Sequence, residues 1–160
     1  MASRGIYAST VFDASSAMIN QVHDLWNTSI TPAVSNAANL TYVLVFQSIP
    51  PVGIGNLMGL DPAAHPEKTL VLCLLSNFWS NNTDTATITA ATKGLVTEIE
   101  TAAKERGAFH DYQYLNYAAG WQDPIASYGT SQVAKLKAVS AKYDPKGLFQ
   151  SGVSGPFKLK

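Results

Sequence analysis

The segment from Tyr42 to Ile49 constrains the fold more than any other part of this sequence. It is apolar on both faces as far as Gln47, which predicts a strand in the middle of a sheet, because strands that are buried on both faces lack the usual polar alternation. Thr69–Trp79 is a second strand-like run, and Ile6–Phe12 is rich in residues that favour strands. The chain is therefore expected to build a sheet that its other segments cover.

Three further segments have apolar residues at helical spacing. The first follows capping side chains at Asp13, Ser15 and Ser16, and Pro32 makes its continuation awkward. The second follows a cap region at residues 81–84 and ends at Gly107, and the third runs from about Ser131 to Tyr143. The apolar positions are Met18, Val22, Leu25, Trp26 and Ile30; Ile88, Leu95, Val96, Ile99 and Ala102; and Val133, Leu136 and Val139.

The order strand, helix, strand, strand, helix predicts an α+β fold, in which an antiparallel sheet has helices packed on one face. A chain of 160 residues is expected to form one domain, residues 1–160. Helices on one face leave the other face and the sheet edges open. We therefore expect a homodimer, because a two-fold interface lets two small sheets cover or extend each other.

Charge and composition exclude several classes of function. The 11 basic and 11 acidic residues give a formal charge of zero, which argues against a nucleic-acid partner. No apolar stretch reaches transmembrane length and no signal core follows Met1, so we expect no membrane association and a cytoplasmic location. The three histidines show no metal-ligand spacing. The single cysteine, Cys73, lies in an apolar run and is expected to be a buried thiol.

The last third of the chain carries a family resemblance. Its segments are Tyr112–Tyr117 (YQYLNY), Gln122–Pro124, Tyr128–Gly129, Lys142–Gln150 (KYDPKGLFQ) and Gly155–Leu159. Together, and in this order, they resemble the C-terminal signature of berberine-bridge-type FAD-linked oxidases, particularly fungal ones. The segment Asn56–Pro62 and the strand that ends at Trp79 are similar to upstream parts of the same substrate domain.

The resemblance also implies what this sequence lacks. In the family, a larger N-terminal domain surrounds the FAD and usually carries a His, and often a Cys, that tethers it covalently. Nothing here corresponds to that domain, and no Gly-rich phosphate turn replaces it. Plant members often place a Gln or Glu on the strand that leads to the Trp, where this chain has Cys73-Leu74-Leu75. We therefore expect no cofactor and no oxidation.

The resemblance further implies three site residues. The first Tyr of the Tyr-x-Asn-Tyr element tends to face the substrate, which makes Tyr114 a candidate acid or base. Asn116 and Tyr117 would line the space beside the absent flavin. Alternation along an extended segment predicts that Tyr114 and Asn116 share one side and that Tyr117 lies on the other. Alternatively, these tyrosines only pack the core.

The residues themselves suggest further candidates. His110 precedes Tyr114 by four residues and would make an acid/base pair with it, or would simply occupy a turn before a strand. Gln47 and Asn77 are polar positions in apolar strands, so each must cap a backbone group or face a pocket. Phe46 and Trp79 would supply apolar walls for a small hydrophobic substrate.

These expectations favour a cofactor-independent cyclase of a fungal natural-product pathway. An apolar pocket with a few hydrogen-bond donors can orient a reactive polyene, quinone methide or enone for Diels–Alder-type or oxa-Michael ring closure. The alternative is a non-catalytic binding protein, or a partner subunit of a separate flavin domain. Neither the substrate nor the type of ring closure is specified by the sequence.

Overall fold

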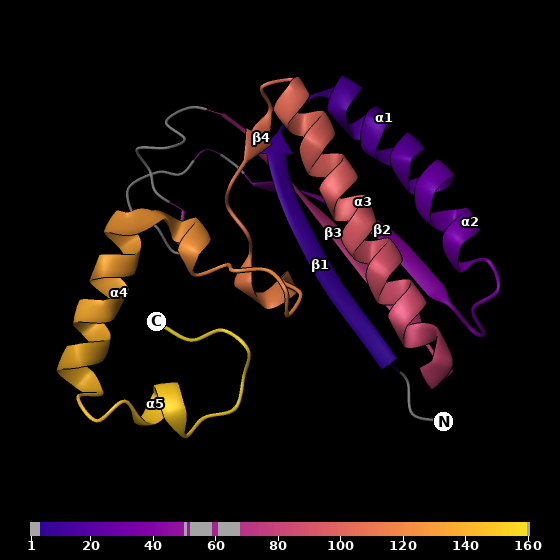
Figure 1. Ribbon diagram of the computed structural model, residues 1–160. Helices are drawn as coiled ribbons and strands as arrows, with labels where there is room; N and C mark the ends of the chain where they lie inside the picture. The colour runs from indigo at the N-terminus through magenta and orange to yellow at the C-terminus, as the bar shows by residue number, and fades with distance from the viewer. Residues whose placement is uncertain (1–3, 50, 52–58, 61–67, 160) are drawn as a thin grey trace.

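The computed structural model describes residues 4–49, 51, 59–60 and 68–159. Most of the Asn56–Pro62 segment lies outside these described residues. Figure 1 shows the sheet, the helices in front of it and a C-terminal part that extends away from both. In chain order, the elements are β1 (Arg4–Asp13), α1 (Ser16–Leu25), a π-helical turn (Trp26–Ile30), α2 (Thr31–Val34), β2 (Thr41–Ile49), β3 (Leu70–Trp79), a 3-10 turn (Asn82–Asp84), α3 (Thr85–Glu105), β4 (Phe109–His110), two further 3-10 turns (Leu115–Tyr117 and Ala126–Tyr128), α4 (Gly129–Tyr143) and α5 (Leu148–Ser151).

The four strands form one antiparallel sheet in the order β2-β3-β1-β4. β1 pairs with β3 along its full length, from Arg4 opposite Trp79 to Asp13 opposite Leu70. β4 adds only two residues, with His110 opposite Val11. The order β-α-β-β-α-β along the chain is that of a split β-α-β arrangement. The fold is thus α+β, with an antiparallel sheet and helices, as the sequence predicts.

The position of β2 differs from the prediction. β2 is an edge strand and pairs only with β3, so the expectation that Tyr42–Ile49 is central was wrong. The central positions belong to β3 and β1, and every residue of β3 from Leu70 to Asn77 is buried. Several residues of β2 are exposed. The exposed residues are Thr41, Val43, Gln47 and Ser48, whereas Tyr42, Leu44 and Phe46 pack against the core on the helix side.

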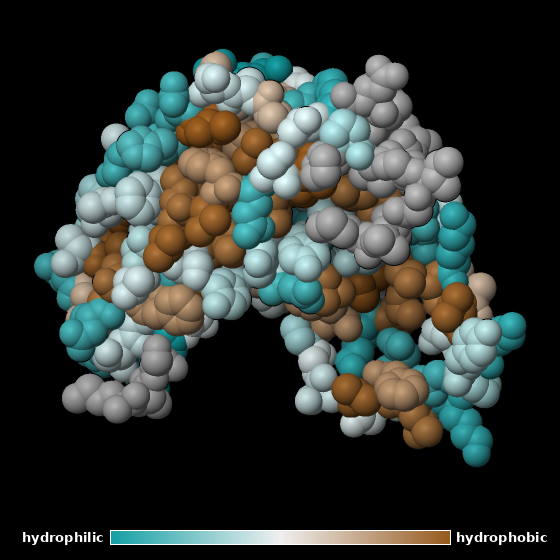
Figure 2. Space-filling view, turned by 180° about the vertical axis from the view of Figure 1, so that it is seen from behind, coloured by the Kyte–Doolittle hydropathy of each residue, from teal (hydrophilic) through white to brown (hydrophobic). Residues whose placement is uncertain are grey.

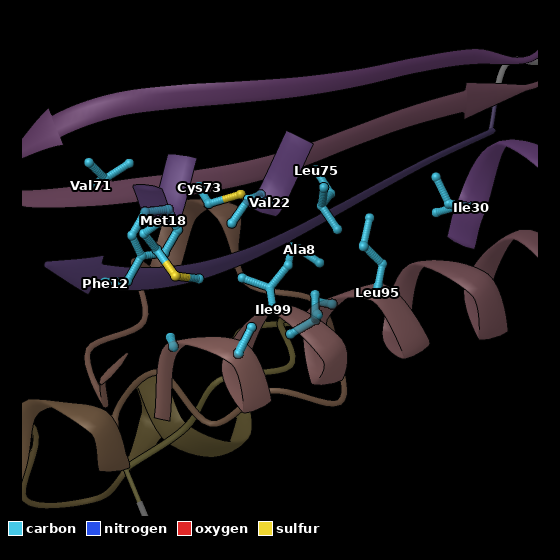
Figure 3. Close-up of a cluster of buried hydrophobic side chains, with 14 of the residues drawn as sticks. Ala8, Phe12, Met18, Val22, Ile30, Val71, Cys73, Leu75, Leu95 and Ile99 are labelled. Atoms are coloured by element: carbon cyan, nitrogen blue, oxygen red, sulfur yellow. The ribbon is translucent and has the colours of Figure 1, made fainter. Parts of the chain in front are cut away.

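Helices α1, α2 and α3 cover one face of the sheet. Ser15 caps α1 as expected, and its hydroxyl accepts a hydrogen bond of 3.1 Å from the backbone N–H of Met18. Side chains of the helices and of the sheet meet in one core between them (Figure 3), where Phe12, Cys73 and Leu75 of the sheet pack with residues of α1 and α3. The helical members include Met18, Val22, Ile30, Ile88, Leu95 and Ile99.

The first helical segment does not end at Pro32. The chain remains helical from Ser16 to Val34, through the π-helical turn at Trp26–Ile30 and into α2. Proline is tolerated there because it lies at the start of α2, where its missing N–H costs least.

In the described part of the chain, helices α1, α2 and α3 lie on the first face alone, and we call the other face of the sheet the open face. Because side chains alternate along a strand, Val11 and its neighbours at positions 7 and 9 of β1 point to it. Leu70, Leu72 and Ile49 also point to it, since Val11, Ile49, Leu70 and Leu72 form a second core cluster with Tyr112. The segment 111–128 covers one end of this face. Leu60 also packs at that end. Among the described residues, Tyr7 and Val43 are the large hydrophobic side chains exposed on the rest of this face, and Figure 2 shows a broad apolar patch on this side of the molecule.

Candidate functional site

The segment 111–128 is held on the open face by the side chain of Gln122. Its Nε2 donates to the backbone carbonyl of Ser9 over 2.7 Å, and its Oε1 accepts from the N–H of Ser9 over 3.2 Å. The same oxygen accepts from the N–H of Ala119 over 2.9 Å. The primary amide therefore pairs with β1 as another strand would. This contact holds the chain on either side of Gln122 against β1.

Beside this contact lies a group that we call the tyrosine cluster: Tyr7, Tyr114, Asn116 and Tyr117. The rings of Tyr114 and Tyr117 meet edge to face, with centroids 5.1 Å apart. The ring of Tyr117 lies 6.1 Å from that of Tyr7 on β1, and Tyr7 meets Phe78 of β3 edge to face at 5.8 Å. The cluster therefore continues directly into the apolar open face.

The hydrogen bond between Asn116 and Tyr114 determines what Tyr114 can do. Asn116 Nδ2 donates to the Tyr114 hydroxyl oxygen over 2.9 Å. A hydroxyl has one proton to donate and can accept two bonds. Because the amide occupies an acceptor position of this oxygen, the phenolic proton can be donated to another oxygen, such as that of a bound molecule. This geometry suits a hydrogen-bond donor or a general acid.

The neighbouring tyrosines Tyr112 and Tyr128 are poor candidates for a general base. Burial raises the pKa of Tyr112 well above its ordinary value, and nearby Tyr128 and Tyr114 add to the effect. Burial also raises the pKa of Tyr128, with a further contribution from Tyr114. Both phenols therefore stay protonated at neutral pH. Their rings stack at 5.9 Å and serve as packing.

His110 lies on the same face, opposite Val11, and contacts Tyr112. Its Nδ1 accepts a hydrogen bond of 2.8 Å from the backbone N–H of Tyr112, so Nδ1 carries no proton and any proton of the neutral ring is on Nε2. The imidazole ring lies 6.4 Å from that of Tyr112. The acid/base pair of His110 with Tyr114 stays a prediction.

Three other candidates point to the helix-covered face. Phe46 packs against the main core. Asn77 is fully buried and its Nδ2 donates to Thr92 Oγ1 of α3 over 2.9 Å. Trp79 is 3% exposed, and its indole N–H donates to Thr85 Oγ1 over 3.1 Å. The sheet separates all three from the tyrosine cluster, whereas Gln47, an exposed residue opposite Leu72, shares the open face with it.

The local backbone corrects one expectation about the cluster. Alternation predicted that Tyr117 would lie on the side away from Tyr114, but Leu115–Tyr117 is a 3-10 turn. The Tyr117 N–H donates to the Tyr114 carbonyl over 3.0 Å, and this turn returns the Tyr117 ring to the side of Tyr114. Two residues of this region were not anticipated from the sequence. Tyr7 of the cluster has the pattern of an ordinary strand residue, and Gln122, which holds the segment 111–128 in place, is indicated only by its position in the family-like segment.

A separate cavity lies on the other side of the molecule. It has a volume of about 370 Å³ and is lined by Trp26, Tyr42 and residues of α2 and the loop after it. The rings of Trp26 and Tyr42 stack in its wall at 5.6 Å. Among the described residues, no three His, Cys, Asp or Glu side chains are grouped to hold a metal, and no helix has the length and apolar character needed to cross a membrane.

Comparison with known proteins finds fungal homologues. The chain is 44% identical over 105 residues to an FAD-dependent monooxygenase of Fusarium proliferatum, which covers 66% of this chain and 20% of the relative. It is 33% identical over 112 residues to the bifunctional solanapyrone synthase of Alternaria solani, covering 70% and 22%. An oligopeptidase of Diaporthe leptostromiformis is 34% identical over 149 residues, covering 89% and 12%.

The homologues are therefore largely fungal FAD-dependent monooxygenases, and the chain spans about a fifth of the length of these curated relatives. Such coverage is consistent with a fragment of a larger flavoenzyme. No family model matches the sequence, and no solved structure matches it.

Proposed function

We propose that the tyrosine cluster binds a small hydrophobic molecule of a fungal natural-product pathway and promotes its ring closure without a cofactor. The observation that carries this proposal is the 2.9 Å hydrogen bond from Asn116 Nδ2 to the Tyr114 hydroxyl. It leaves the phenolic proton available beside an apolar surface. The resemblance to berberine-bridge-type substrate domains, and the fungal flavoenzyme homologues, support a small-molecule site on this chain.

The chemistry that fits is oxa-Michael ring closure of a hydroxy-enone. A substrate hydroxyl adds to the β-carbon of the enone, a C–O bond forms, and negative charge develops on the carbonyl oxygen. Tyr114 donates a hydrogen bond to that oxygen, and the hydroxyl proton finally moves to the α-carbon, so no oxidant is required. A single well-placed donor to a developing oxyanion is worth about 10²–10³ in rate.

The apolar surroundings supply the second contribution. Tyr7 and Phe78 offer ring faces and edges next to Tyr114, against which a flat conjugated substrate can lie. Orientation of the two reacting groups then lowers the entropic part of the barrier. On this single chain the surface forms one wall of a pocket, and a second wall has to come from another body.

The experiment uses 2′-hydroxychalcone, which closes to a flavanone spontaneously and gives both enantiomers equally in free solution. The wild-type chain is expected to raise the rate and to produce one enantiomer in excess. Tyr114→Phe should reduce the rate above background by about 10²-fold, whereas Tyr42→Phe, a matched change on the helix-covered face, should not. Racemic product at the background rate overturns the proposal. An unchanged rate in Tyr114→Phe removes the hydrogen-bond role and leaves orientation alone.

A second candidate function rests on the partial coverage of the homologues. The chain spans about a fifth of the length of FAD-dependent monooxygenases and exposes apolar side chains on one face of its sheet. It could therefore serve as the partner subunit of a separate flavin domain. If the purified chain stays yellow, or binds FAD alone during gel filtration, then it has its own flavin site. That result would contradict this candidate function and would favour an FAD-dependent activity like that named for the relatives.

A further inference from the structure

Large exposed hydrophobic side chains gather in two places among the described residues. Tyr7 and Val43 lie on the open face, because Tyr7 pairs with Ser76 and Val43 pairs with the same residue from the other side. The others lie in residues 129–159, which we call the C-terminal arm. They are Leu136, Val139, Tyr143, Leu148, Phe149 and Val153, with exposed fractions from 38% to 72%.

The arm projects from the rest of the molecule. In Figure 1, α4 and α5 lie apart from the sheet and its helices, and Figure 2 shows the arm as a lobe with apolar side chains on its surface. No residue of α4 or α5 is buried. Val133, Leu136 and Val139 mark the apolar side of this helix, as expected. Val133 is half-buried, whereas Leu136 and Val139 are exposed.

The tip of the arm is nevertheless ordered by its own hydrogen bonds. The carboxylate of Asp144 accepts from the backbone N–H groups of Leu148 and Phe149 over 2.8 and 2.9 Å. The ammonium group of Lys158 donates to the carbonyls of Phe149 and Val153 over 3.0 and 2.6 Å. Exposed apolar residues on a backbone that is already fixed lose little entropy when they bind, which is the character of a preformed docking element.

Charge is divided sharply between the arm and the rest of the chain. Residues 1–128 contain five Lys and Arg and ten Asp and Glu, a formal charge of −5. Residues 129–160 contain six Lys and one Asp, a formal charge of +5. The zero net charge of the sequence therefore hides two opposite halves. Asp111 and Asp123, both exposed, lie in the segment that borders the open face. Opposite charges of this kind steer association and select its orientation.

We propose that two copies of this chain form a two-fold dimer by exchanging arms, so that the arm of each packs on the open face of the other. A second copy supplies both requirements at once, an apolar basic arm and an apolar face on an acidic body. The contact is self-complementary, and closed symmetry uses both surfaces of both copies. The partner's arm would then cover Tyr7 and form the missing wall beside Tyr114. The dimer itself does not depend on any ring-closure activity.

The first test is the mass of the purified chain by light scattering after gel filtration. Wild type is expected to elute with twice the mass of one chain. Phe149→Asp should halve that mass, because it places a charge in the contact, and its circular dichroism should stay that of wild type, since Phe149 is 66% exposed. Ser154→Asp, an exposed change on the same tail, is the matched control and should remain dimeric. A monomeric wild type overturns the proposal, as does a Phe149→Asp dimer.

The second test locates the contact. Val43→Cys and Val153→Cys are made in separate chains, mixed, and treated with a flexible bis-maleimide. The native Cys73 is fully buried and does not compete. Arm exchange is supported if crosslinks form between the two different chains in the mixture. These crosslinks should decrease when Phe149→Asp is added to the Val153→Cys chain. A dimer without such crosslinks means that other surfaces associate, and refutes the exchange of arms.

Discussion

Removal of the Gln122 side chain is expected to lower the free energy of unfolding by about 3 kcal/mol. Gln122 is 9% exposed and makes three hydrogen bonds to the backbones of Ser9 and Ala119. In Gln122→Ala, two N–H groups and one carbonyl lose their partner, and each buried unsatisfied group costs about 1–3 kcal/mol. Water that enters the space recovers part of this cost, which places the sum near the lower end. Since domains are stable by only about 5–15 kcal/mol, the loss is easily measured.

The variant Gln122→Glu separates the donor from the acceptor function. The neutral carboxyl can keep all three bonds, whereas the carboxylate cannot donate to the Ser9 carbonyl and brings two oxygens together. The pKa of the introduced carboxyl is therefore raised in the folded state. Its contribution to stability should be complete below the unfolded pKa of about 4.3 and should be lost as the pH rises through the raised folded pKa.

Urea titrations monitored by tryptophan fluorescence measure both effects, with wild type followed at each pH as the reference. Gln47→Ala, which changes an exposed glutamine of β2, is the control and should change the free energy of unfolding by only a few tenths of a kcal/mol. The reasoning fails if Gln122→Ala costs no more than this control, or if the stability difference between Gln122→Glu and wild type does not change with pH.

Two further results are expected from the helix-covered face. Asn77→Ala should destabilise the fold by about 2–3 kcal/mol because it leaves the Thr92 hydroxyl without the amide. The double change Asn77→Leu with Thr92→Val should cost much less, since both polar groups are removed together. A double-mutant cycle in which the two changes are simply additive would contradict this. Burial raises the pKa of Cys73 to about 12, so the thiol stays protonated in the fold and alkylation by iodoacetamide at pH 8 should proceed only through unfolding, at a rate that rises with urea; rapid alkylation of the native chain would show that the thiol is accessible.

The sequence predicted the elements of the fold well because periodicity reports burial directly. The strands at Ile6–Phe12, Tyr42–Ile49 and Thr69–Trp79 and the three helices are all found within a few residues of their expected bounds. The edge position of β2 could not be predicted, because an apolar strand has the same composition whether its open face meets its own core or a second body. β4 has only two residues, which is too short to show the alternating pattern of a strand in the sequence.

The candidate site was predictable only where it is local. Tyr114, Asn116 and Tyr117 lie within four residues, and the structure brings them together. Tyr7 joins them through strand pairing that spans most of the chain, and no local pattern indicates it. Asn77 was grouped with them as a polar position in an apolar strand and Trp79 as an apolar wall, but a residue's side of a sheet depends on register, which composition does not encode.

The order of strands in space differs from their order along the chain, and this difference sets the order in which the sheet can assemble. β1 is made first but has no partner until β3 arrives at Leu70, and β2 has to wait for the same strand. The outer edge of β1 is closed only by β4 and Gln122. During synthesis, β1 is therefore an unpaired strand until β3 emerges, and its outer edge stays exposed for roughly a further forty residues. Non-local pairings of this kind slow folding, and an unpaired edge can recruit other chains. A chain shortened before residue 122 would keep that edge exposed permanently.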